Sequence, residues 1–373
     1  MKKKIALITI YHVPNFGSVL QTYATQVLLE KLGMECHIIN YKYPNEYHYS
    51  LGRQKQSLKS KIARIFGLSA DHRKAKKLLD FKKKHFNFTK LYKSLDELKK
   101  ADWSSYDMFA VGSDQVWKAQ FTLGDSVFLL SFIPDGKYRI SIASSFASKN
   151  VPDNFIEIYR KYLGKFNAIS VREHNGIDII KKDLRLNCTP EVILDPTLLL
   201  SKEQWMEIVP RSNFKKKKKY ILLYMLAYAF EPRPYIFEVI KHLQTQDNYE
   251  VVALEGYTPK EQALGIEMTN KTDSSIPEFI DLFANADIVV TSSFHGTAFA
   301  VNFGIPLISV VPEGDNDDRQ SSLLKSIGLN CCIANSRVAI NEIKYDYERE
   351  SAYQHLKKLR NKSIDWINNK ISN

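Results

Sequence analysis

The chain has 373 residues, of which 44% are hydrophobic and 25% charged, a composition that excludes an intrinsically disordered protein. This length is too great for one ordinary core and predicts two domains of typical size. The net charge of +12 lies in residues 51–100, which hold 16 basic and four acidic side chains, so it does not describe the rest of the chain.

The first forty residues predict a strand, a loop, a helix and a second strand. Residues 4–10 are a continuous apolar run, as in a strand that is buried on both faces. Apolar residues then recur at helical spacing over 20–28, and Gly33 ends this helix. Residues 35–40 are the next strand. Together these elements predict a βαβ unit and hence a parallel sheet.

The basic segment, residues 51–100, has three interpretations. The first is a solvated helical pair that covers part of the N-terminal domain. The second is contact with an anionic membrane surface, which basic amphipathic helices commonly make. Nucleic acid is the third and weakest, because the aromatic residues have core-like spacing and no known binding motif is present, so we expect no nucleic-acid partner.

Strand patterns return after the basic segment, and each ends in polar residues. Ligands of parallel sheets bind at these carboxyl ends. The four expected strands are residues 108–112, 139–144, 168–172 and 192–195. Residues 210–219, with five consecutive lysines, then predict a solvated linker.

The alternation of strands and helices restarts after the linker. Strands are expected at 220–226, 249–254, 287–291 and 306–311, and helices at 234–244, 276–285, from His295, and at 320–327. The last 24 residues predict a long amphipathic helix. We therefore predict an N-terminal Rossmann-like domain (1–209), a linker (210–219), a C-terminal Rossmann-like domain (220–345) and a final helix (346–373). Two α/β domains of similar size predict a small-molecule site in the cleft between them.

Several classes of protein and site are not supported by the sequence. The four cysteines are too few and too scattered for a disulfide scaffold, which fits a reducing compartment. The apolar runs are too short for a signal peptide or a membrane-spanning helix, so we expect a cytoplasmic, soluble protein. Dinucleotide, P-loop, zinc-protease and calcium-loop motifs are missing, and we expect no bound metal.

The segment Thr291-Ser-Ser-Phe-His-Gly-Thr297 is the sharpest candidate for chemistry. It follows an apolar strand and opens a helix, whose free N–H groups and positive dipole suit a phosphate or carboxylate. Ser292, Ser293 and Thr297 add hydroxyls, Gly296 allows close backbone approach, and His295 can move a proton near neutral pH. In the alternative interpretation the serines only cap the helix and His295 only packs.

Three further residues stand where ligands are expected. Asp114 follows a strand and could act as a base or bind sugar hydroxyls, although a helix cap is equally consistent. Arg172 ends another strand and suits bidentate binding of phosphate or carboxylate, although an ion pair with Glu173 is as plausible. Arg319 lies beside a polar loop from which it could reach the cleft.

Taken in chain order, eight short segments resemble the polysaccharide pyruvyl transferase family. Each is weak alone, but the ordered set is specific and covers nearly the whole chain. The segments are Asn15-Phe-Gly-Ser-Val-Leu-Gln-Thr-Tyr-Ala24, Gly112-Ser-Asp-Gln-Val-Trp117, Ser141-Ile-Ala-Ser-Ser-Phe146, Ser170-Val-Arg-Glu173, Asp195-Pro-Thr-Leu-Leu199, Thr291-Ser-Ser-Phe-His-Gly-Thr297, Gly304-Ile-Pro306, and Arg319 through Leu323-Leu324.

This resemblance implies a fold, an activity and a set of partners. The fold is a glycosyltransferase-B-like pair of Rossmann-like domains facing a cleft, with the last helix crossing back to the N-terminal domain. The activity is transfer of a pyruvyl group from phosphoenolpyruvate to hydroxyls of a surface-polysaccharide precursor, giving a ketal and phosphate. Phosphoenolpyruvate is then a co-substrate, and no cofactor is expected. The saccharide acceptor is often lipid-linked, which would place the protein at the inner face of the cell membrane.

The resemblance also assigns roles to residues of this chain. His295 is the expected proton donor, and Asp114 orients or deprotonates the acceptor. The donor is expected to meet Arg172, Ser292, Ser293, Gly296, Thr297 and Arg319. The acceptor is expected to meet Asn15, Gly17 and Gln21.

Two other functions remain open from sequence. A nucleotide-sugar-dependent glycosyltransferase on the same fold could hold a diphosphate at the same helix start. A non-catalytic polysaccharide-binding protein would bind its ligand without turnover and would not depend on His295.

Overall fold

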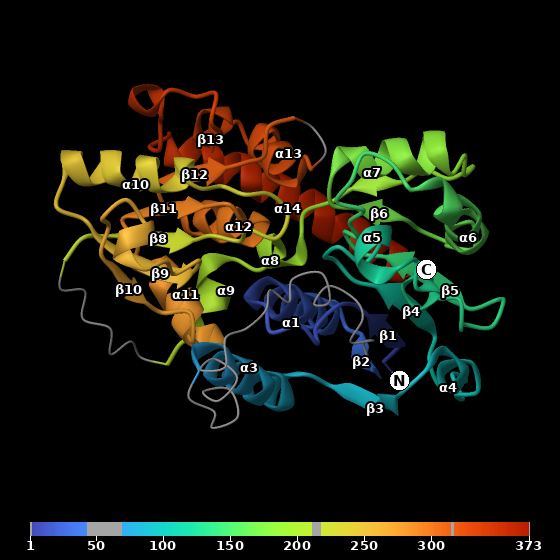
Figure 1. Ribbon diagram of the computed structural model, residues 1–373. Coiled ribbons are helices and arrows are strands. Elements are labelled where there is room, and N and C mark those ends of the chain that lie inside the picture. The colour runs from blue at the N-terminus through green and yellow to red at the C-terminus, as the bar shows by residue number, and fades with distance from the viewer. Residues whose placement is uncertain (1, 43–68, 211–217, 315–316, 373) are drawn as a thin grey trace.

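The computed structural model describes residues 2–42, 69–210, 218–314 and 317–372, which form two α/β halves side by side (Figure 1). Each half contains one main sheet in which all strands run parallel. Side chains along a strand alternate between its two faces, so successive residues of a central strand pack against different layers of helices. In β1, for example, Ile5 and Leu7 join one buried cluster, and Ala6 and Ile8 join another.

The N-terminal half holds five strands in the order β3-β2-β1-β4-β5. Bridges from Ile140 to Ala168 and from Ser144 to Val171 extend this sheet to the β6–β7 pair. The strands are β1 (Lys4–Ile8), β2 (Glu35–Tyr41), β3 (Phe88–Tyr92), β4 (Met108–Val111), β5 (Tyr138–Ser141), β6 (Ser170–Val171) and β7 (Glu191–Val192).

The C-terminal half holds six strands in the order β10-β9-β8-β11-β12-β13. The central strand β8 is buried along its whole length, as a strand covered on both faces must be. The strands are β8 (Tyr220–Tyr224), β9 (Glu250–Glu255), β10 (Met268–Asn270), β11 (Ile288–Thr291), β12 (Leu307–Val310) and β13 (Ile333–Ala334).

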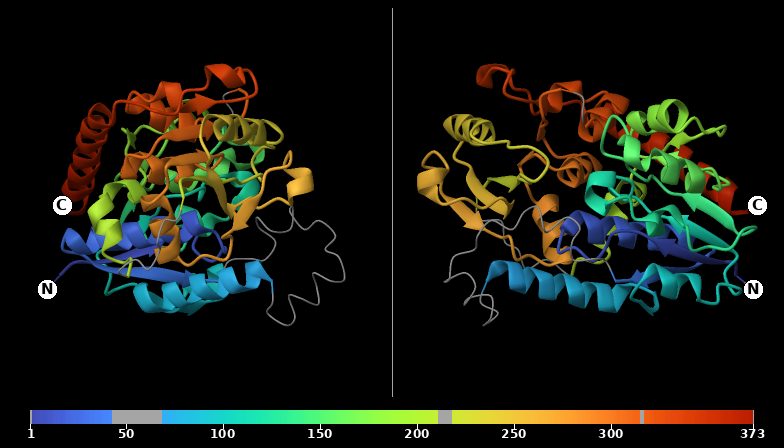
Figure 2. Two further views of the ribbon diagram at one scale, coloured as in Figure 1. Left: turned by 90° about the vertical axis from the view of Figure 1, so that its left-hand side faces the viewer. Right: turned by 45° about the vertical axis from the view of Figure 1, so that its right-hand side comes forward.

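Helices cover both faces of the two sheets (Figures 1 and 2). The N-terminal half contributes α1 (Phe16–Lys31), α3 (Ala70–His85), α4 (Leu95–Lys99), α5 (Ala119–Thr122), α6 (Asp153–Leu163), α7 (His174–Asp178), α8 (Pro196–Leu199) and α9 (Lys202–Met206). The rest are α10 (Tyr235–Gln246), α11 (Ile276–Ala284), α12 (Phe294–Phe303), α13 (Arg319–Ser326) and α14 (Arg349–Ser372). Short 3-10 or π turns occur at Ser126–Leu129, Ile179–Asp183, Lys260–Gln262, Asn330–Cys332 and Ile340–Glu342.

The two halves are joined by packing and by α14. Helix α14 starts in the C-terminal half and ends beside the chain's first strand, where Lys3 Nζ donates to Ser372 O at 3.0 Å. On the way, Arg360 is buried and donates to Leu198 O at 2.6 Å and to the Asn302 side chain at 2.8 Å. Figure 2 shows α14 running along one side of both halves.

Helix α3 makes a second set of contacts between the halves. Lys74 pairs with Glu255 at the end of β9, and its ammonium lies 4.3 Å from the centre of the Phe16 ring. Lys77 Nζ lies 2.9 Å from Glu278 Oε2 at the start of α11. The basic segment thus supplies structural ion pairs as well as exposed charge.

The hydrophobic pattern of the sequence predicted the order of the central strands and helices. Several of their first and last residues differ in the structure. The predicted strand 139–144 is regular only over Tyr138–Ser141, and the predicted strand 168–172 only over Ser170–Val171. The structure adds α6 and the edge strands β3, β10 and β13, which the pattern did not predict. Residues 51–68 of the basic segment and 211–217 of the predicted linker lie outside the described residues.

A membrane-spanning helix is not found in the described parts of the chain: none of their helices is both long and apolar enough to cross a bilayer.

Candidate active site

Four titratable side chains, three of them predicted from the sequence, meet between the halves. Asp114 follows β4, Arg172 follows β6 and Asp195 follows β7, so all three come from carboxyl ends in the extended N-terminal sheet. His295 comes from the other half, in the first turn of α12. All four are buried, with exposed fractions of 1–8%.

Asp195 is the anchor of this cluster. Its Oδ2 accepts from Arg172 Nη1 at 2.8 Å and from Ser113 Oγ at 2.7 Å. Its Oδ1 accepts from the backbone N–H and hydroxyl of Thr197, at 2.9 and 2.6 Å. Burial alone would raise the pKa of Asp195, but the nearby positive charges and these hydrogen bonds outweigh it and lower the pKa to about 2. Asp195 is therefore a fixed negative charge.

His295 lies against both Asp195 and the first helix of the N-terminal half. Its Nε2 is 3.9 Å from Asp195 Oδ2 and has no hydrogen-bond partner among the described residues. Burial lowers the pKa of His295 more than Asp195 and Asp114 raise it, and Arg172 and Arg319 lower it further. The imidazole is therefore neutral near pH 7 in the free protein.

Gly17 leaves room for the His295 ring. A Cβ atom at Gly17 would lie 2.0 Å from His295 Nδ1, far inside contact distance. Gly17 is the second residue of α1, and Asn15 caps that helix by accepting from Ser18 N at 3.3 Å. A glycine is thus required here for close packing between the halves rather than for a special backbone angle.

Asp114 is held in an uncommon backbone conformation. Its φ of 72° lies in the left-handed region, which costs an L residue roughly 1–2 kcal/mol and is retained where the surroundings enforce it. Its Oδ2 accepts from Ser18 Oγ at 2.8 Å, and its Oδ1 lies 3.9 Å from Arg172 Nη2. Burial would raise the pKa of Asp114, but His295, Arg172, Arg319 and the Ser18 hydrogen bond lower it, so the group is ionised.

Arg172 is fixed on one side and open to further hydrogen bonds on the other. Its guanidinium carbon lies 4.2 Å above the centre of the Phe294 ring, a cation–π contact across the two halves. Its Nε and Nη2 are buried and have no hydrogen-bond partner among the described residues. Buried donors without an acceptor are costly, so these two N–H groups are candidates for bonding a ligand.

Arg319 opens helix α13 at the edge of the same cluster. It is buried and forms a bidentate pair with Asp317, whose Oδ1 accepts from Arg319 Nε at 2.7 Å. Burial would lower the pKa of Arg319, but Asp317 and the Tyr228 and Glu173 side chains raise it, so it stays charged. The sequence therefore identified Asp114, Arg172, His295 and Arg319 as separate candidates, and the structure brings them together.

The other predicted donor-binding residues have internal partners. Ser292 bonds both the N–H and the carbonyl of Leu226, at 2.9 Å each, and Ser293 is the N-cap of α12. Thr297 Oγ1 lies 2.8 Å from Ser309 Oγ. A Cβ atom at Gly296 would lie 2.2 Å from Thr291 Oγ1, so this glycine allows close packing.

Gln21, predicted to meet the acceptor, is fully buried beneath the loop after β1. Its amide nitrogen donates to Thr9 Oγ1 at 3.0 Å and to Ile10 O at 3.2 Å, and so holds the loop that precedes α1. Asn15 and Gly17 lie at the helix start beside His295. A contact of these three residues with the acceptor stays a prediction.

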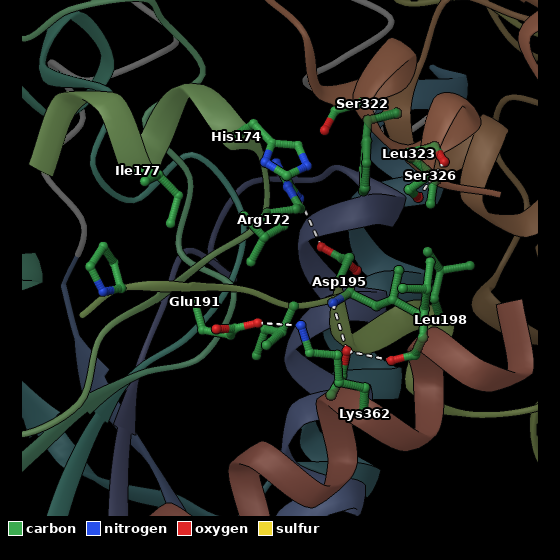
Figure 3. A pocket seen from close by; sticks show the side chains of 17 residues that line it. Arg172, His174, Ile177, Glu191, Asp195, Leu198, Ser322, Leu323, Ser326 and Lys362 are labelled. Carbon is green, nitrogen blue, oxygen red and sulfur yellow. Dashed lines mark hydrogen bonds and ion pairs between the residues drawn. The ribbon is translucent and has the colours of Figure 1, made fainter. Parts of the chain in front are cut away.

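A cavity of about 310 Å³ reaches the cluster from the side of α7, α13 and α14 (Figure 3). Arg172, Asp195 and Phe294 form its inner wall, and Ser322 and Lys362 lie on its outer walls. Its size lies in the range of small-molecule sites, about 300–1,000 Å³.

Three residues of this site were missed as functional candidates. Asp195 and Phe294 lie in segments that support only the family resemblance. For Glu173 the sequence suggests only an ion pair with Arg172. Glu173 is fully buried and its Oε1 accepts from Ser145 Oγ at 2.9 Å and Phe146 N at 3.0 Å. The position of Asp195 at a predicted strand end was the signal that could have found it.

No group of three His, Cys, Asp or Glu side chains in the described ranges is placed to hold a metal ion.

The sequence profile of one family, described as polysaccharide pyruvyl transferase, matches residues 15–314. No curated protein matches the chain by sequence. Solved structures with a similar fold include the UDP-GlcNAc 2-epimerase of Neisseria meningitidis bound to UDP-GlcNAc, at 12% identity, a TM-score of 0.52 and 99% coverage of both chains.

Two further solved structures are similar at comparable levels. The UDP-GlcNAc 2-epimerase of Methanocaldococcus jannaschii has 13% identity and a TM-score of 0.53, with 96% of this chain and 93% of that chain covered. Medicago truncatula UGT71G1 complexed with UDP-glucose has 10% identity and a TM-score of 0.50, with 100% and 99% covered. These likenesses confirm the predicted glycosyltransferase-B-like fold of two Rossmann-like domains.

Proposed function

Because the chain belongs to the polysaccharide pyruvyl transferase family, we propose that it transfers the pyruvyl group of phosphoenolpyruvate to two hydroxyls of a saccharide. The observation that carries this proposal is that Arg172 Nε, Arg172 Nη2 and His295 Nε2 are buried without a hydrogen-bond partner among the described residues, next to two ionised carboxylates. The saccharide is a precursor of a surface polysaccharide. We expect phosphoenolpyruvate to act as a co-substrate without any cofactor.

The donor's chemistry matches the charged cluster. Phosphoenolpyruvate carries a phosphate and a carboxylate, and either group can accept from the planar fork of Arg172. Its Nε and Nη2 have no hydrogen bond among the described residues and lie 3.9 Å from the carboxylates of Glu173 and Asp114. Arg319 adds a second buried positive charge at the same edge. The cavity beside Arg172 and Asp195 has room for a small anion next to Arg172, although Asp114, His295 and Arg319 are not among the residues that line it.

The remaining groups support addition to the enol double bond. His295, once protonated, gives its proton to C3 of the donor, which makes C2 electrophilic. A sugar hydroxyl oriented by Asp114 attacks C2 and passes its proton to the Asp114 carboxylate. A second hydroxyl of the same sugar then replaces the phosphate on C2 and gives its proton to the departing phosphate, and the proton on Asp114 is returned to restore His295, so that the products are the cyclic ketal and inorganic phosphate.

Loss of the Arg172 guanidinium should abolish donor binding. In the variant Arg172→Ala, the affinity for phosphoenolpyruvate measured by calorimetry should fall at least about 30-fold, because a buried charged hydrogen-bonding partner is worth roughly 2–5 kcal/mol. The exposed Arg337 provides a matched control, Arg337→Ala, whose affinity should stay unchanged. Binding of UDP-sugars but not of phosphoenolpyruvate to the wild type would contradict the proposed function and favour a glycosyltransferase.

Donor binding should also take up a proton. His295 is neutral in the free protein because burial lowers its pKa, and the negative charges of bound phosphoenolpyruvate would raise that pKa. Above pH 7, where the donor's own phosphate is already ionised, the binding enthalpy should depend on the ionisation enthalpy of the buffer, and affinity should fall as pH rises. His295→Gln should remove this dependence; an equal uptake in that variant would assign the proton to another group.

We also propose that α3 contacts an anionic membrane surface, where a lipid-linked acceptor would be presented. Lys76 and Lys83 are exposed two helical turns apart on its outer face, with Lys84 beside Lys83. Leu79 lies between them along the helix and is 45% exposed. Each lysine near such a surface contributes about 1 kcal/mol to the free energy of membrane binding.

A sedimentation assay with vesicles of phosphatidylcholine and phosphatidylglycerol tests this contact. Replacing Lys76, Lys83 and Lys84 with glutamine should weaken binding about 100-fold. A control with the exposed Lys241, Lys271 and Lys325 replaced in the same way should bind like the wild type. Equal loss in both variants would indicate a response to net charge and not to α3.

A further inference from the structure

Two aromatic rings from opposite halves meet at the edge of the catalytic cluster. Phe121 belongs to α5 of the N-terminal half, and Tyr228 to the loop between β8 and α10. Their ring centres lie 6.2 Å apart and their planes are tilted by 60°. Tyr228 is 52% exposed, so much of its ring faces solvent. The pair bridges the two halves, and Tyr228 contributes exposed ring surface there, whereas Phe121 is half-buried.

The hydroxyl end of Tyr228 points toward the catalytic groups. It lies 3.4 Å from Gln115 Nε2, and Gln115 directly follows Asp114 in the chain. Burial of the hydroxyl raises the pKa of Tyr228, and the charges of Arg319 and Asp114 also act on it. The aromatic pair therefore lies next to the carboxylate that we expect to orient the acceptor hydroxyl.

Two polar side chains complete this surface. Gln115 is 3% exposed, and its Oε1 is buried with no hydrogen-bond partner in the described part of the chain. Lys118 lies with its ammonium 4.2 Å from the centre of the Phe121 ring. An acceptor without a hydrogen bond and a cationic donor, set beside the exposed ring of Tyr228, are groups that small-molecule sites combine with apolar surface.

We propose that Tyr228 and Phe121 form a platform for the pyranose ring of the acceptor, with Gln115 and Lys118 bonding its hydroxyls. This proposal rests on the proposed function and assigns the acceptor to a surface separate from Arg172. The apolar face of the sugar packs on the aromatic rings, and its hydroxyl edge is directed toward Asp114. The proposed ligand is a hexose, because the ring of Tyr228 is exposed and Gln115 and Lys118 can bond hydroxyls.

Direct binding of simple sugars tests the platform independently of turnover. The probes are methyl β-galactoside, methyl β-glucoside and methyl α-mannoside, followed by saturation-transfer NMR on the full chain. At least one should bind the wild type. Tyr228→Ala and Phe121→Ala should each weaken it about tenfold or more, whereas Tyr228→Phe, which keeps the ring, should stay within about twofold.

Controls separate this proposal from the proposed function. Tyr353→Ala removes a tyrosine of similar exposure (48%) on α14 and should leave glycoside binding unchanged. Each platform variant should keep its affinity for phosphoenolpyruvate. Failure of the wild type to bind any probe, or unchanged binding in both alanine variants, overturns the platform, whereas missing phosphoenolpyruvate binding with intact glycoside binding overturns only the proposed donor.

Discussion

His295→Ala should lower kcat by about 10²- to 10⁴-fold, the usual contribution of a positioned proton donor. The ring is buried with an unpartnered Nε2, so its loss removes the group that we expect to protonate the donor. The fold should persist, because the substitution leaves α12 and its Ser293 cap in place. Phosphate release from phosphoenolpyruvate in the presence of an acceptor measures the rate.

The control for this variant is an exposed histidine far from the cluster. His355→Ala, on the outer face of α14, should retain wild-type turnover and the same melting temperature. Near-normal turnover of His295→Ala would end the assignment of His295 as proton donor and would require another group to protonate C3 of the donor.

Gly17→Ala should reduce turnover nearly as strongly, by about 100-fold, although it adds a single methyl group. The new Cβ would lie 2.0 Å from His295 Nδ1, so the imidazole or the whole helix start must move. A displacement of about 1 Å at a catalytic group is enough to cost that factor. Steady-state kinetics with both substrates, together with the melting temperature, measures the effect.

A double-mutant cycle shows whether Gly17 acts through His295. In the His295→Ala background the clash is removed, so Gly17→Ala should cause little further loss of rate or stability. If the two losses multiply instead, the glycine serves another purpose, such as leaving room for a substrate.

The sequence predicted the two-domain α/β fold because its signals are local. Apolar runs such as Tyr220–Tyr224 can only be strands covered on both faces, and cap residues such as Ser293 mark where helices start. The short edge strands β10 and β13 were missed because two or three residues carry no period that a pattern can reveal.

The sequence identified individual site residues but did not predict which of them contact one another. Asp114, Arg172 and His295 were each found from a strand or helix end, but the contacts of Arg172 with Asp114 and of Arg172 and His295 with Asp195 join positions up to 100 residues apart. The role of Phe294 under Arg172, and the fit of Gly17 against His295, depend on how the halves pack. No spacing within one segment encodes such packing.

The return of α14 to the first strand has a consequence for motion. The chain passes between the halves twice, once between α9 and β8 and once along α14, where Arg360 ties Leu198 to Asn302. A body attached at two separate points can turn most easily about the line that joins them. A rotation about that line would separate His295 from Gly17, and it would also have to break the ion pairs of Lys74 and Lys77 on α3 with the C-terminal half.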